Sequence, residues 1–221
     1  MWQKKSDKDL ERDVKEELAF DPRVDVKAIT VSAKDGVVTL SGSAPTWAAK
    51  LTACQDAERV SGVNVVVEHL DVSLPDMHAR TDADLAKAAA DALRWDVEVP
   101  QGEIKTSVRD GWITLEGKVD WQYQRAAADG AVRYLVGVKG VTNQIAVTPP
   151  PGRSIDVKQH IKDALTRSAE TDAQRITVDT AEGGAVTLRG TIHSWAERED
   201  VVRAAWATPG VRKVQDDLIY A

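Results

Sequence analysis

The sequence predicts an α+β protein built from three tandem αββαβ modules, each a three-stranded sheet with two helices on one face. Two motifs that recur in register predict this arrangement. The motif Gly-x-Val/Ile-Thr-Leu-x-Gly occurs at residues 36–42, 111–117 and 184–190. A Gly-Val pair begins at Gly62, Gly137 and Gly210. Both motifs recur at offsets of 75 and 73 residues, which indicates one structural unit written three times.

The repeat divides the chain into three modules joined by short linkers. We expect the modules at residues 1–75, 76–150 and 151–221. The second linker, at residues 148–153, contains three consecutive prolines and is predicted to be extended and semi-rigid, which would restrict the distance between the last two modules. Units of about 70 residues are individually marginal in stability, so mutual support between modules is also expected.

The first helix of each module is predicted from apolar residues four positions apart, which share one helix face. These stripes are Leu10, Val14 and Leu18; Leu85, Ala89 and Leu93; and Val157, Ile161 and Leu165. Ser6-x-x-Asp9 and Thr81-x-x-Asp84 have the form of capping boxes at the start of the first two helices. Pro22 and Pro100 prevent those helices from continuing.

A β-hairpin follows each first helix. Alternating residues such as Ile29, Val31 and Ala33 predict a strand with one buried face. Asp35-Gly36 and Asp110-Gly111 then predict two-residue hairpin turns, because Asp-Gly tolerates the positive φ angles that such turns require. The third copy has Glu182-Gly183-Gly184, one residue longer.

The second helix and the last strand complete each module. The predicted helix starts are Thr46-Trp47, Asp120-Trp121 and Ser194-Trp195, with Thr46, Asp120 and Ser194 as N-caps and Ser194-x-x-Glu197 as a capping box. In the first copy, the last strand is expected to place Val63, Val65 and Val67 on one face and Val66 and Leu70 on the other.

Nine glycines are predicted to be structural, because they stand where the chain turns or leaves the sheet. They are Gly36, Gly42, Gly62, Gly111, Gly117, Gly137, Gly184, Gly190 and Gly210.

These elements and motifs together resemble the BON domain (bacterial OsmY and nodulation), in three tandem copies that cover nearly the whole chain. The segment 115–125, Leu-Glu-Gly-Lys-Val-Asp-Trp-Gln-Tyr-Gln-Arg, is typical of proteins with several such domains. The resemblance implies a non-enzymatic binding module linked to osmotic or envelope stress, and several members of the family contact phospholipid membranes.

Composition restricts the classes of function. The formal charge of -6 argues against a nucleic-acid binder, which needs a basic face. A single cysteine, Cys54, excludes an internal disulfide, and the four histidines share no aligned position, so no metal and no cofactor is expected. The Gly137-x-x-Gly140 loop has the form of an RNA clamp but would join a helix to a strand rather than two helices. No nucleophile and base occur together at aligned positions of the copies, so the sequence gives no indication of an enzyme.

Location is predicted from the N-terminus. No run of 7–15 apolar residues follows Met1, so no secretory signal is present as written and we expect a cytoplasmic protein, or a periplasmic one if an export signal has been removed. The acidic residues crowded into residues 7–17 are interpreted as a solvated helix face.

Four tryptophans are the candidate contact residues. Trp47, Trp121 and Trp195 stand at the start of the second helices, where an aromatic ring can enter a membrane interface or grip a partner, or can pack over its own helix–sheet junction. Trp112 is predicted on the sheet face that no helix covers, where it would meet another module, a second chain or a ligand.

Two hypotheses about function follow. In the first, the protein is a stress-related binding or scaffold protein that associates with phospholipid membrane or envelope components. In the second, it is a cytoplasmic protein–protein adaptor or a homo-oligomer that uses its open sheet faces. The sequence leaves the oligomeric state open.

Overall fold

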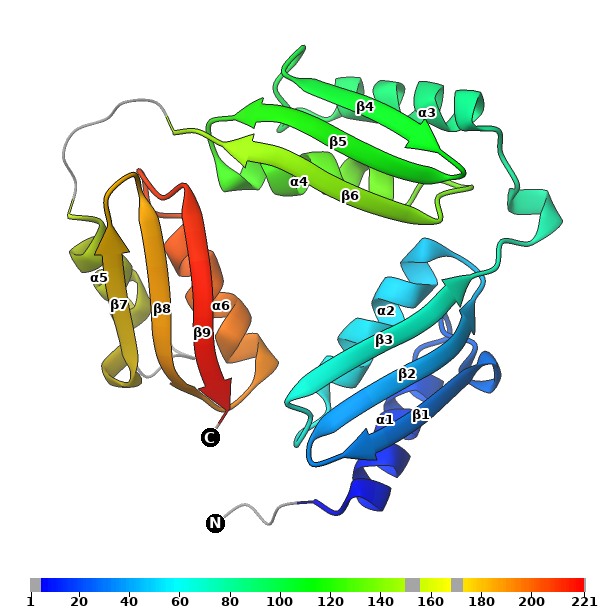
Figure 1. The fold of residues 1–221 in the computed structure, drawn as a ribbon, viewed down its shortest axis with the longest axis horizontal. Helices are drawn as coiled ribbons and strands as arrows, with labels where there is room; N and C mark the ends of the chain where they lie inside the picture. Colours follow the sequence, from blue (N-terminus) through cyan, green and yellow to red (C-terminus); the bar gives the residue numbers. More distant parts are fainter. Residues whose placement is uncertain (1–4, 150–155, 168–172, 221) are drawn as a thin grey trace. The chain divides into compact units, whose positions relative to one another are not determined.

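The protein is described by a computed structural model covering residues 5–149, 156–167 and 173–220. Its strands form three-stranded sheets with the orders β1-β2-β3, β4-β5-β6 and β7-β8-β9, each accompanied by two helices (Figure 1). This confirms the predicted α+β fold of three tandem modules. Pro150 and Pro151 of the predicted semi-rigid linker lie outside the described residues.

The elements follow the same order in each module. Module 1 contains α1 (Asp7–Phe20), β1 (Ile29–Lys34), β2 (Val37–Ala44), α2 (Trp47–Arg59) and β3 (Val65–Val72). Module 2 contains α3 (Asp82–Trp95), β4 (Ile104–Arg109), β5 (Trp112–Val119), α4 (Gln122–Arg133) and β6 (Gly140–Val147). Module 3 contains α5 (Val157–Arg167), β7 (Ile176–Ala181), β8 (Ala185–Ile192), α6 (Trp195–Trp206) and β9 (Lys213–Tyr220). Single 3₁₀ turns η1 (Val26–Ala28), η2 (Asp76–His78) and η3 (Ala173–Arg175) precede β1, α3 and β7.

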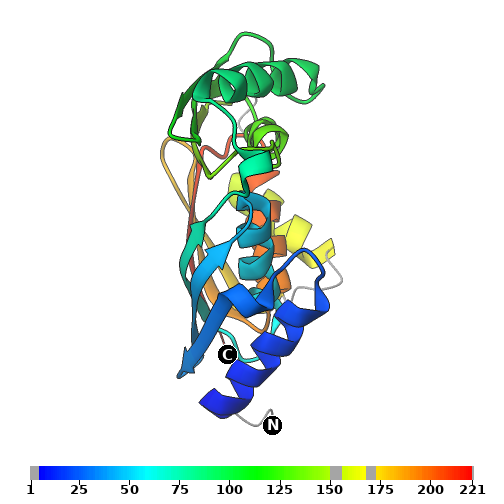
Figure 2. The same ribbon diagram turned by 90° about the vertical axis from the view of Figure 1, so that its right-hand side faces the viewer.

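The pairing of the strands is mixed. β1 and β2 form an antiparallel hairpin in which Lys34 pairs with Val37, and β2 then pairs in parallel with β3. Module 3 repeats the pattern. Parallel neighbours need a crossover connection, and α2 and α6 provide it. In Figures 1 and 2 both helices of module 1 lie on the same side of its sheet.

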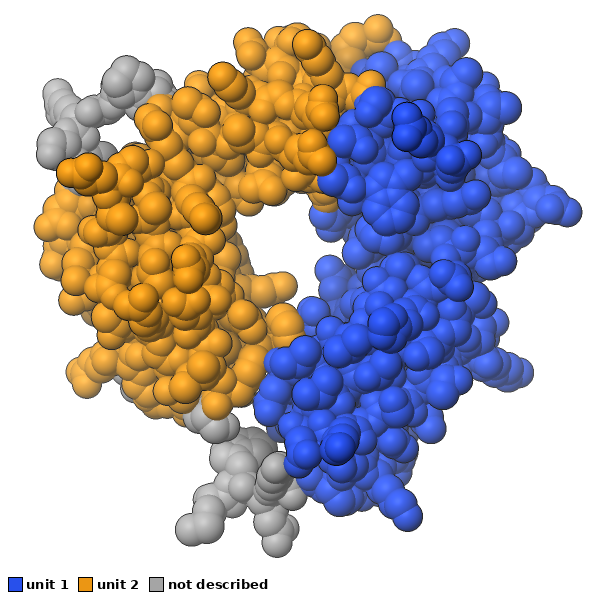
Figure 3. Space-filling view, viewed as in Figure 1, with its two compact units in different colours: residues 1–92, 107–114, 131–142 blue, residues 93–106, 115–130, 143–221 orange. Residues whose placement is uncertain are grey.

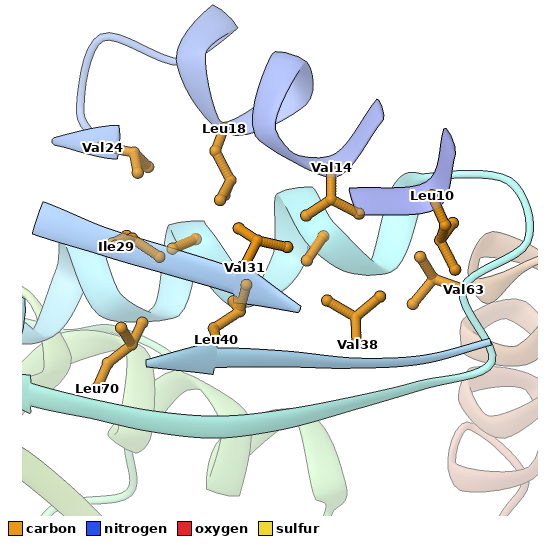
Figure 4. Close-up of a cluster of buried hydrophobic side chains, with 12 residues drawn as sticks. Leu10, Val14, Leu18, Val24, Ile29, Val31, Val38, Leu40, Val63 and Leu70 are labelled. Atoms are coloured by element: carbon orange, nitrogen blue, oxygen red, sulfur yellow. The ribbon is translucent and has the colours of Figure 1, made fainter. Parts of the chain in front are cut away.

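The core of module 1 lies between its sheet and its helices. Leu10, Val14 and Leu18 of α1 meet Val38 and Leu40 of β2, and Figure 4 shows these side chains gathered between the helix and the strands. All five are fully or almost fully buried. In module 3, Ile161, Leu165, Val186, Leu188, Val201 and Ala205 form the corresponding core. The predicted helix stripes and the buried face of the second strand are therefore confirmed.

The turns also agree with the sequence. Asp35 and Gly36 both have positive φ, as do Asp110 and Gly111, which is the backbone geometry of a type I′ hairpin. Ser6 accepts a hydrogen bond from the Asp9 N–H at 3.2 Å and caps α1.

Three local predictions are wrong. Val63 does not share the exposed face of Val65, because β3 begins only at Val65 and Val63 is buried in the core. Asp120 does not cap a helix that starts at Trp121. Instead α4 begins at Gln122, the Trp121 carbonyl accepts the first helical bond from Arg125, and Gln124 accepts the N–H groups of residues 120 and 121.

The third error concerns the capping box at α6. Ser194 accepts the Glu197 N–H at 3.1 Å as expected, but the Glu197 carboxylate accepts the His193 N–H at 2.7 Å rather than that of Ser194. The reciprocal bond of the box therefore reaches one residue further back.

Figure 3 shows the two compact units of the chain. Unit 1 contains residues 1–92, 107–114 and 131–142, and unit 2 contains residues 93–106, 115–130 and 143–221. Every contact described below lies within one of these units. The module boundaries near residues 75 and 150 stay a prediction.

Candidate functional site

Trp47 and Trp112 lie against each other in unit 1. Their ring centroids are 5.8 Å apart with the planes tilted by 58°, and the Lys50 ammonium lies 5.3 Å from the Trp47 ring. The Trp112 indole N–H donates to Thr142 Oγ1 at 2.7 Å. Its ring lies on Gly140, where an added Cβ would be only 2.4 Å from the ring. Of the three alternatives for Trp112, the structure contains the contact with another module, although the side chain is still 44% exposed.

Trp195 also lies beside an aromatic ring and a cation, and both of these belong to its own module. Its ring is 5.8 Å from that of Tyr220, and the Arg198 guanidinium lies 5.3 Å from the Trp195 centroid. Trp121 differs, because it occupies the N-cap position that Thr46 and Ser194 hold in the other modules. Trp47, Trp121 and Trp195 are all half-buried. Whether the four predicted tryptophans contact a membrane or an outside partner stays a prediction.

A polar contact between the second helix and the last strand recurs in every module. In module 1, Lys50 Nζ donates to the Leu70 carbonyl at 2.6 Å and lies 2.8 Å from Glu68 Oε1. The same Glu68 oxygen accepts the Leu70 N–H at 2.7 Å. A helix cation and a strand carboxylate thus bind each other and also both backbone groups of Leu70.

Modules 2 and 3 join the corresponding residues through other atoms, because Arg125 binds the backbone carbonyl of Asn143 rather than that of Ile145 and Arg198 binds the Asp216 carboxylate. Arg125 donates to the Asn143 carbonyl at 3.3 Å, and Asn143 Oδ1 accepts the Ile145 N–H at 3.1 Å. In module 3, Arg198 donates to Asp216 at 2.7 Å, and Asp216 accepts the Leu218 N–H at 3.1 Å. We call these pairs the edge clasps: Lys50–Glu68, Arg125–Asn143 and Arg198–Asp216.

The sequence reasoning missed the edge clasps. Their signal was present, because the two residues of each pair are 18 positions apart and recur at the offsets of the glycine motifs. It was weak because the strand residue is Glu, Asn or Asp in turn, so only the ability to accept a hydrogen bond is shared.

Acidic residues of the first helices bind backbone groups of the hairpins. Glu11 accepts the Ala33 N–H at 3.0 Å and Asp7 accepts the Asp35 N–H at 2.9 Å. Asp82 accepts both hairpin N–H groups of module 2, from Asp110 at 2.8 Å and Gly111 at 2.9 Å. Among the acids of residues 7–17, Asp7 and Glu11 therefore bind the hairpin as well as facing solvent.

The two most exposed aromatic side chains of the described residues stand at the ends of first helices. Phe20 ends α1 and is 87% exposed, and Trp95 ends α3 and is 82% exposed. They occupy equivalent positions, 75 residues apart. Val97, two residues after Trp95, is 98% exposed. Sequence reasoning missed them because a residue at a helix end carries no periodic signal for exposure.

The helix that leads to Trp95 presents basic residues to solvent. Lys87 and Arg94 are exposed and lie seven residues apart, on the same face of α3. The acids in its first turn are engaged elsewhere, since Asp82 binds the hairpin and Asp84 binds the backbone and hydroxyl of Thr81. Asp91 lies between these two basic residues on the same face, so the outward stripe that ends near Trp95 carries both signs of charge.

Comparison with known proteins agrees with these modules. The family model for the BON domain matches residues 6–73, 81–149 and 156–221. The chain belongs to the BON domain family. A curated relative, osmotically-inducible protein Y of Escherichia coli strain K12, is 32% identical over 122 residues. That alignment covers 53% of this chain and 60% of the relative, so it spans less than two thirds of either protein.

Solved structures resemble the BON chain only distantly. CdsD, a structural protein of the type III secretion system of Chlamydia trachomatis, is 16% identical with a TM-score of 0.27, and the alignment covers 96% of this chain and 92% of that one. The C-terminal domain of CdsD is also 16% identical, with a TM-score of 0.26 over 96% of this chain and 98% of that domain. Similarity at this level carries no argument about function.

The titratable groups of the BON modules include two perturbed side chains in α2. Burial raises the pKa of the Cys54 thiol to about 11, so the thiolate is scarce and the residue is a poor nucleophile at neutral pH. Burial also raises the pKa of Asp56. Its side chain is 2% exposed, one oxygen lies 3.3 Å from Arg59, and the other makes no hydrogen bond among the described residues.

No part of the described BON chain assembles three His, Cys, Asp or Glu side chains able to hold a metal ion. No helix in residues 5–149, 156–167 or 173–220 is long and apolar enough to cross a membrane. A cleft of about 810 Å³ in unit 1 is lined by Lys50, Arg109 and Lys139 but also by Asp71 and Asp110, a mixture of charges that favours no single class of ligand.

Proposed function

We propose that this BON protein is a non-enzymatic binding protein that associates with anionic phospholipid surfaces through the end of α3. The observation that carries the proposal is the exposure of Trp95 and Val97 next to the exposed Arg94 at the end of α3. Tryptophan favours the membrane–water interface because its ring is apolar and its N–H is polar. Lys87 and Arg94 would add electrostatic attraction to anionic headgroups.

Osmotic stress is the setting that the relative supports. Osmotically-inducible protein Y carries that condition in its name, and we propose the same setting for this chain. A scaffold or binding role agrees with the absence of an aligned nucleophile and base in the sequence and with the raised pKa of the single cysteine. The cellular location stays a prediction, because an anionic lipid surface borders more than one compartment.

Vesicle co-sedimentation tests the proposal. Wild type is expected to sediment with vesicles containing phosphatidylglycerol at low salt and to be released as salt rises, because screening weakens the attraction. Trp95→Ala is expected to weaken binding by about tenfold, since burial of a large side chain stabilises by roughly 1.5–3 kcal/mol.

The predicted tryptophans provide the comparison. Trp47→Ala, Trp121→Ala and Trp195→Ala change half-buried rings and are expected to alter stability more than vesicle binding. Circular dichroism checks that each variant is folded. If wild type fails to bind anionic vesicles at low salt, or if Trp95→Ala binds as well as wild type, the lipid proposal is wrong.

The open sheet face of module 1 supports a second candidate, a protein–protein adaptor or homo-oligomer. Val37 and Val65 are cross-strand partners on the face without helices, and both are exposed. Light scattering tests this candidate. A mass above that of the monomer that falls in Val65→Glu would favour it, whereas a monomer unaffected by the substitution would contradict the homo-oligomer.

A further inference from the structure

The last strand of every module lies at the edge of its sheet. β3, β6 and β9 each have one strand neighbour, so their other side carries backbone N–H and C=O groups that no strand bonds. Such an edge is a template for pairing with a strand of another chain. Three of them in one polypeptide make uncontrolled association a serious hazard.

In each module the edge clasp occupies an outward backbone N–H near the end of the last strand, and in module 1 it also occupies the carbonyl of the same residue. In a strand, the N–H and C=O of one residue point to the same side, and successive residues alternate. The Leu70 N–H bonds Glu68 and the Leu70 C=O bonds Lys50, so both groups point away from β2 and neither is available to a new strand.

The three clasps share a result rather than a side-chain chemistry. Module 1 uses a Lys–Glu ion pair, module 3 an Arg–Asp ion pair, and module 2 an uncharged asparagine beside an arginine. In all three, the strand residue accepts the N–H two positions further along, at residues 70, 145 and 218. An ion pair kept only for its charge would not be replaced by asparagine.

We propose that the edge clasp is a guard that prevents a strand of a second copy of this chain from adding to β3, β6 or β9. The opposite edge of module 1 carries a related device, because Glu11 accepts the Ala33 N–H on the side of β1 that faces away from β2. The guard is independent of lipid binding, since the clasp residues are not part of the α3 surface.

The test opens one edge and compares two matched variants. Lys50→Met with Glu68→Met removes the clasp of module 1 while keeping side chains of similar length. Lys50→Arg with Glu68→Asp installs the pair that module 3 uses, and is expected to behave like wild type. Leu40→Ala, a core change that leaves the clasp in place, shows what loss of stability alone does.

Light scattering across a range of concentrations gives the main readout. The clasp-free variant is expected to have a higher apparent mass than wild type at equal concentration. The Arg/Asp variant and Leu40→Ala are both expected to keep the wild-type mass. Hydrogen exchange by NMR gives the local readout, and we expect the Leu70 amide to exchange about tenfold faster when its charged acceptor is removed.

Two results would overturn the proposal. One is a folded clasp-free variant whose Leu70 amide exchanges faster but whose mass stays at the wild-type value. The other is association of Leu40→Ala to the same extent, which would assign the effect to instability. If the double variant does not fold, Asn143→Val removes the uncharged clasp of module 2 and is judged by the same two criteria with the Ile145 amide.

Discussion

At the scale of single residues, Asp56 shows how one copy has departed from the others. It is a buried acid in α2, whereas the equivalent positions are Ala131 and Ala204. Arg59 lies near one of its oxygens, and the other lacks a hydrogen bond among the described residues. A buried carboxylate without full hydrogen bonding costs free energy, so this position should weaken module 1 when Asp56 is ionised.

The pH dependence of that cost follows from the raised pKa of Asp56. Because the folded state holds this proton to a higher pH than the unfolded chain, the contribution of Asp56 to stability is most favourable below about 3.8, the ordinary value, and is lost as pH rises through the folded-state pKa. Asp56→Ala is therefore expected to raise the free energy of unfolding at neutral pH by about 1 kcal/mol.

Denaturant unfolding of wild type and Asp56→Ala at several pH values checks this. The gain should shrink as the pH falls towards 3.8, because both proteins are then uncharged at this position. A part of the gain that does not depend on pH would reflect the higher helix propensity of alanine. A variant that is less stable at neutral pH would contradict the prediction.

At the scale of elements, the glycine that closes the second strand is required by two constraints. Gly117 has φ 148°, and a Cβ there would lie 2.2 Å from the Glu103 carbonyl oxygen. Gly42 and Gly190 meet the same obstacle at Ala28 and Arg175. Contact with backbone leaves no flexible side chain that can move aside, so the element itself would have to shift.

Two glycine-to-alanine substitutions in module 2 distinguish a glycine that the backbone requires from one that it does not. Gly117→Ala is expected to lower the free energy of unfolding by about 3 kcal/mol through clash and strain. Gly130→Ala, in α4 with nothing within 4 Å of the added Cβ, is expected to raise it by about 0.5–1 kcal/mol. Chemical denaturation measures both, and equal effects of the two substitutions would contradict the interpretation.

The predictability of the elements depended on whether a signal was local. Leu10, Val14 and Leu18 predicted α1 because helical periodicity and burial coincide, and Asp35-Gly36 predicted its turn because the backbone angles demand those residues. The start of α4 was predicted one residue early, because Asp120 is a good cap by type but Gln124 supplies the acceptor in the folded chain. Competition between caps is decided by packing, which the sequence does not display.

The candidate sites were less predictable than the fold. Tryptophan at the start of α2 and α6 was noticed because it recurs. The pairs Lys50–Glu68 and Arg198–Asp216 were not, since a contact between positions 18 residues apart needs the fold to be known. Trp95 was missed for the opposite reason: its exposure depends on α3 ending at that residue, and helix ends are poorly determined by pattern.

At the scale of the whole molecule, the buried clusters of modules 1 and 3 are separate. Each draws its residues from one module only. Leu188→Ala, at a fully buried position of β8, is expected to lower the stability of module 3 by about 2–5 kcal/mol. Hydrogen exchange should show the loss in β7, β8 and β9 while the amides of β1 and β2 keep their wild-type rates.

The reciprocal variant completes that test. Leu40→Ala should accelerate exchange in β1, β2 and β3 and leave module 3 unchanged. If either substitution accelerates exchange equally in modules 1 and 3, the modules unfold as one cooperative unit and separate cores do not imply separate stabilities.

The seat of Trp112 on Gly140 has a consequence for chimeric or consensus versions of this chain. The same cross-strand site holds Val37 with Val65 in the first copy and Ala185 with Lys213 in the third. The two positions therefore differ together: module 1 has two valines of medium size, and module 2 has a large tryptophan ring packed on a glycine that has no side chain. If the residue at each of these two positions were chosen separately from the three copies, tryptophan could be combined with valine and the two side chains would clash. The two positions therefore have to be transferred together.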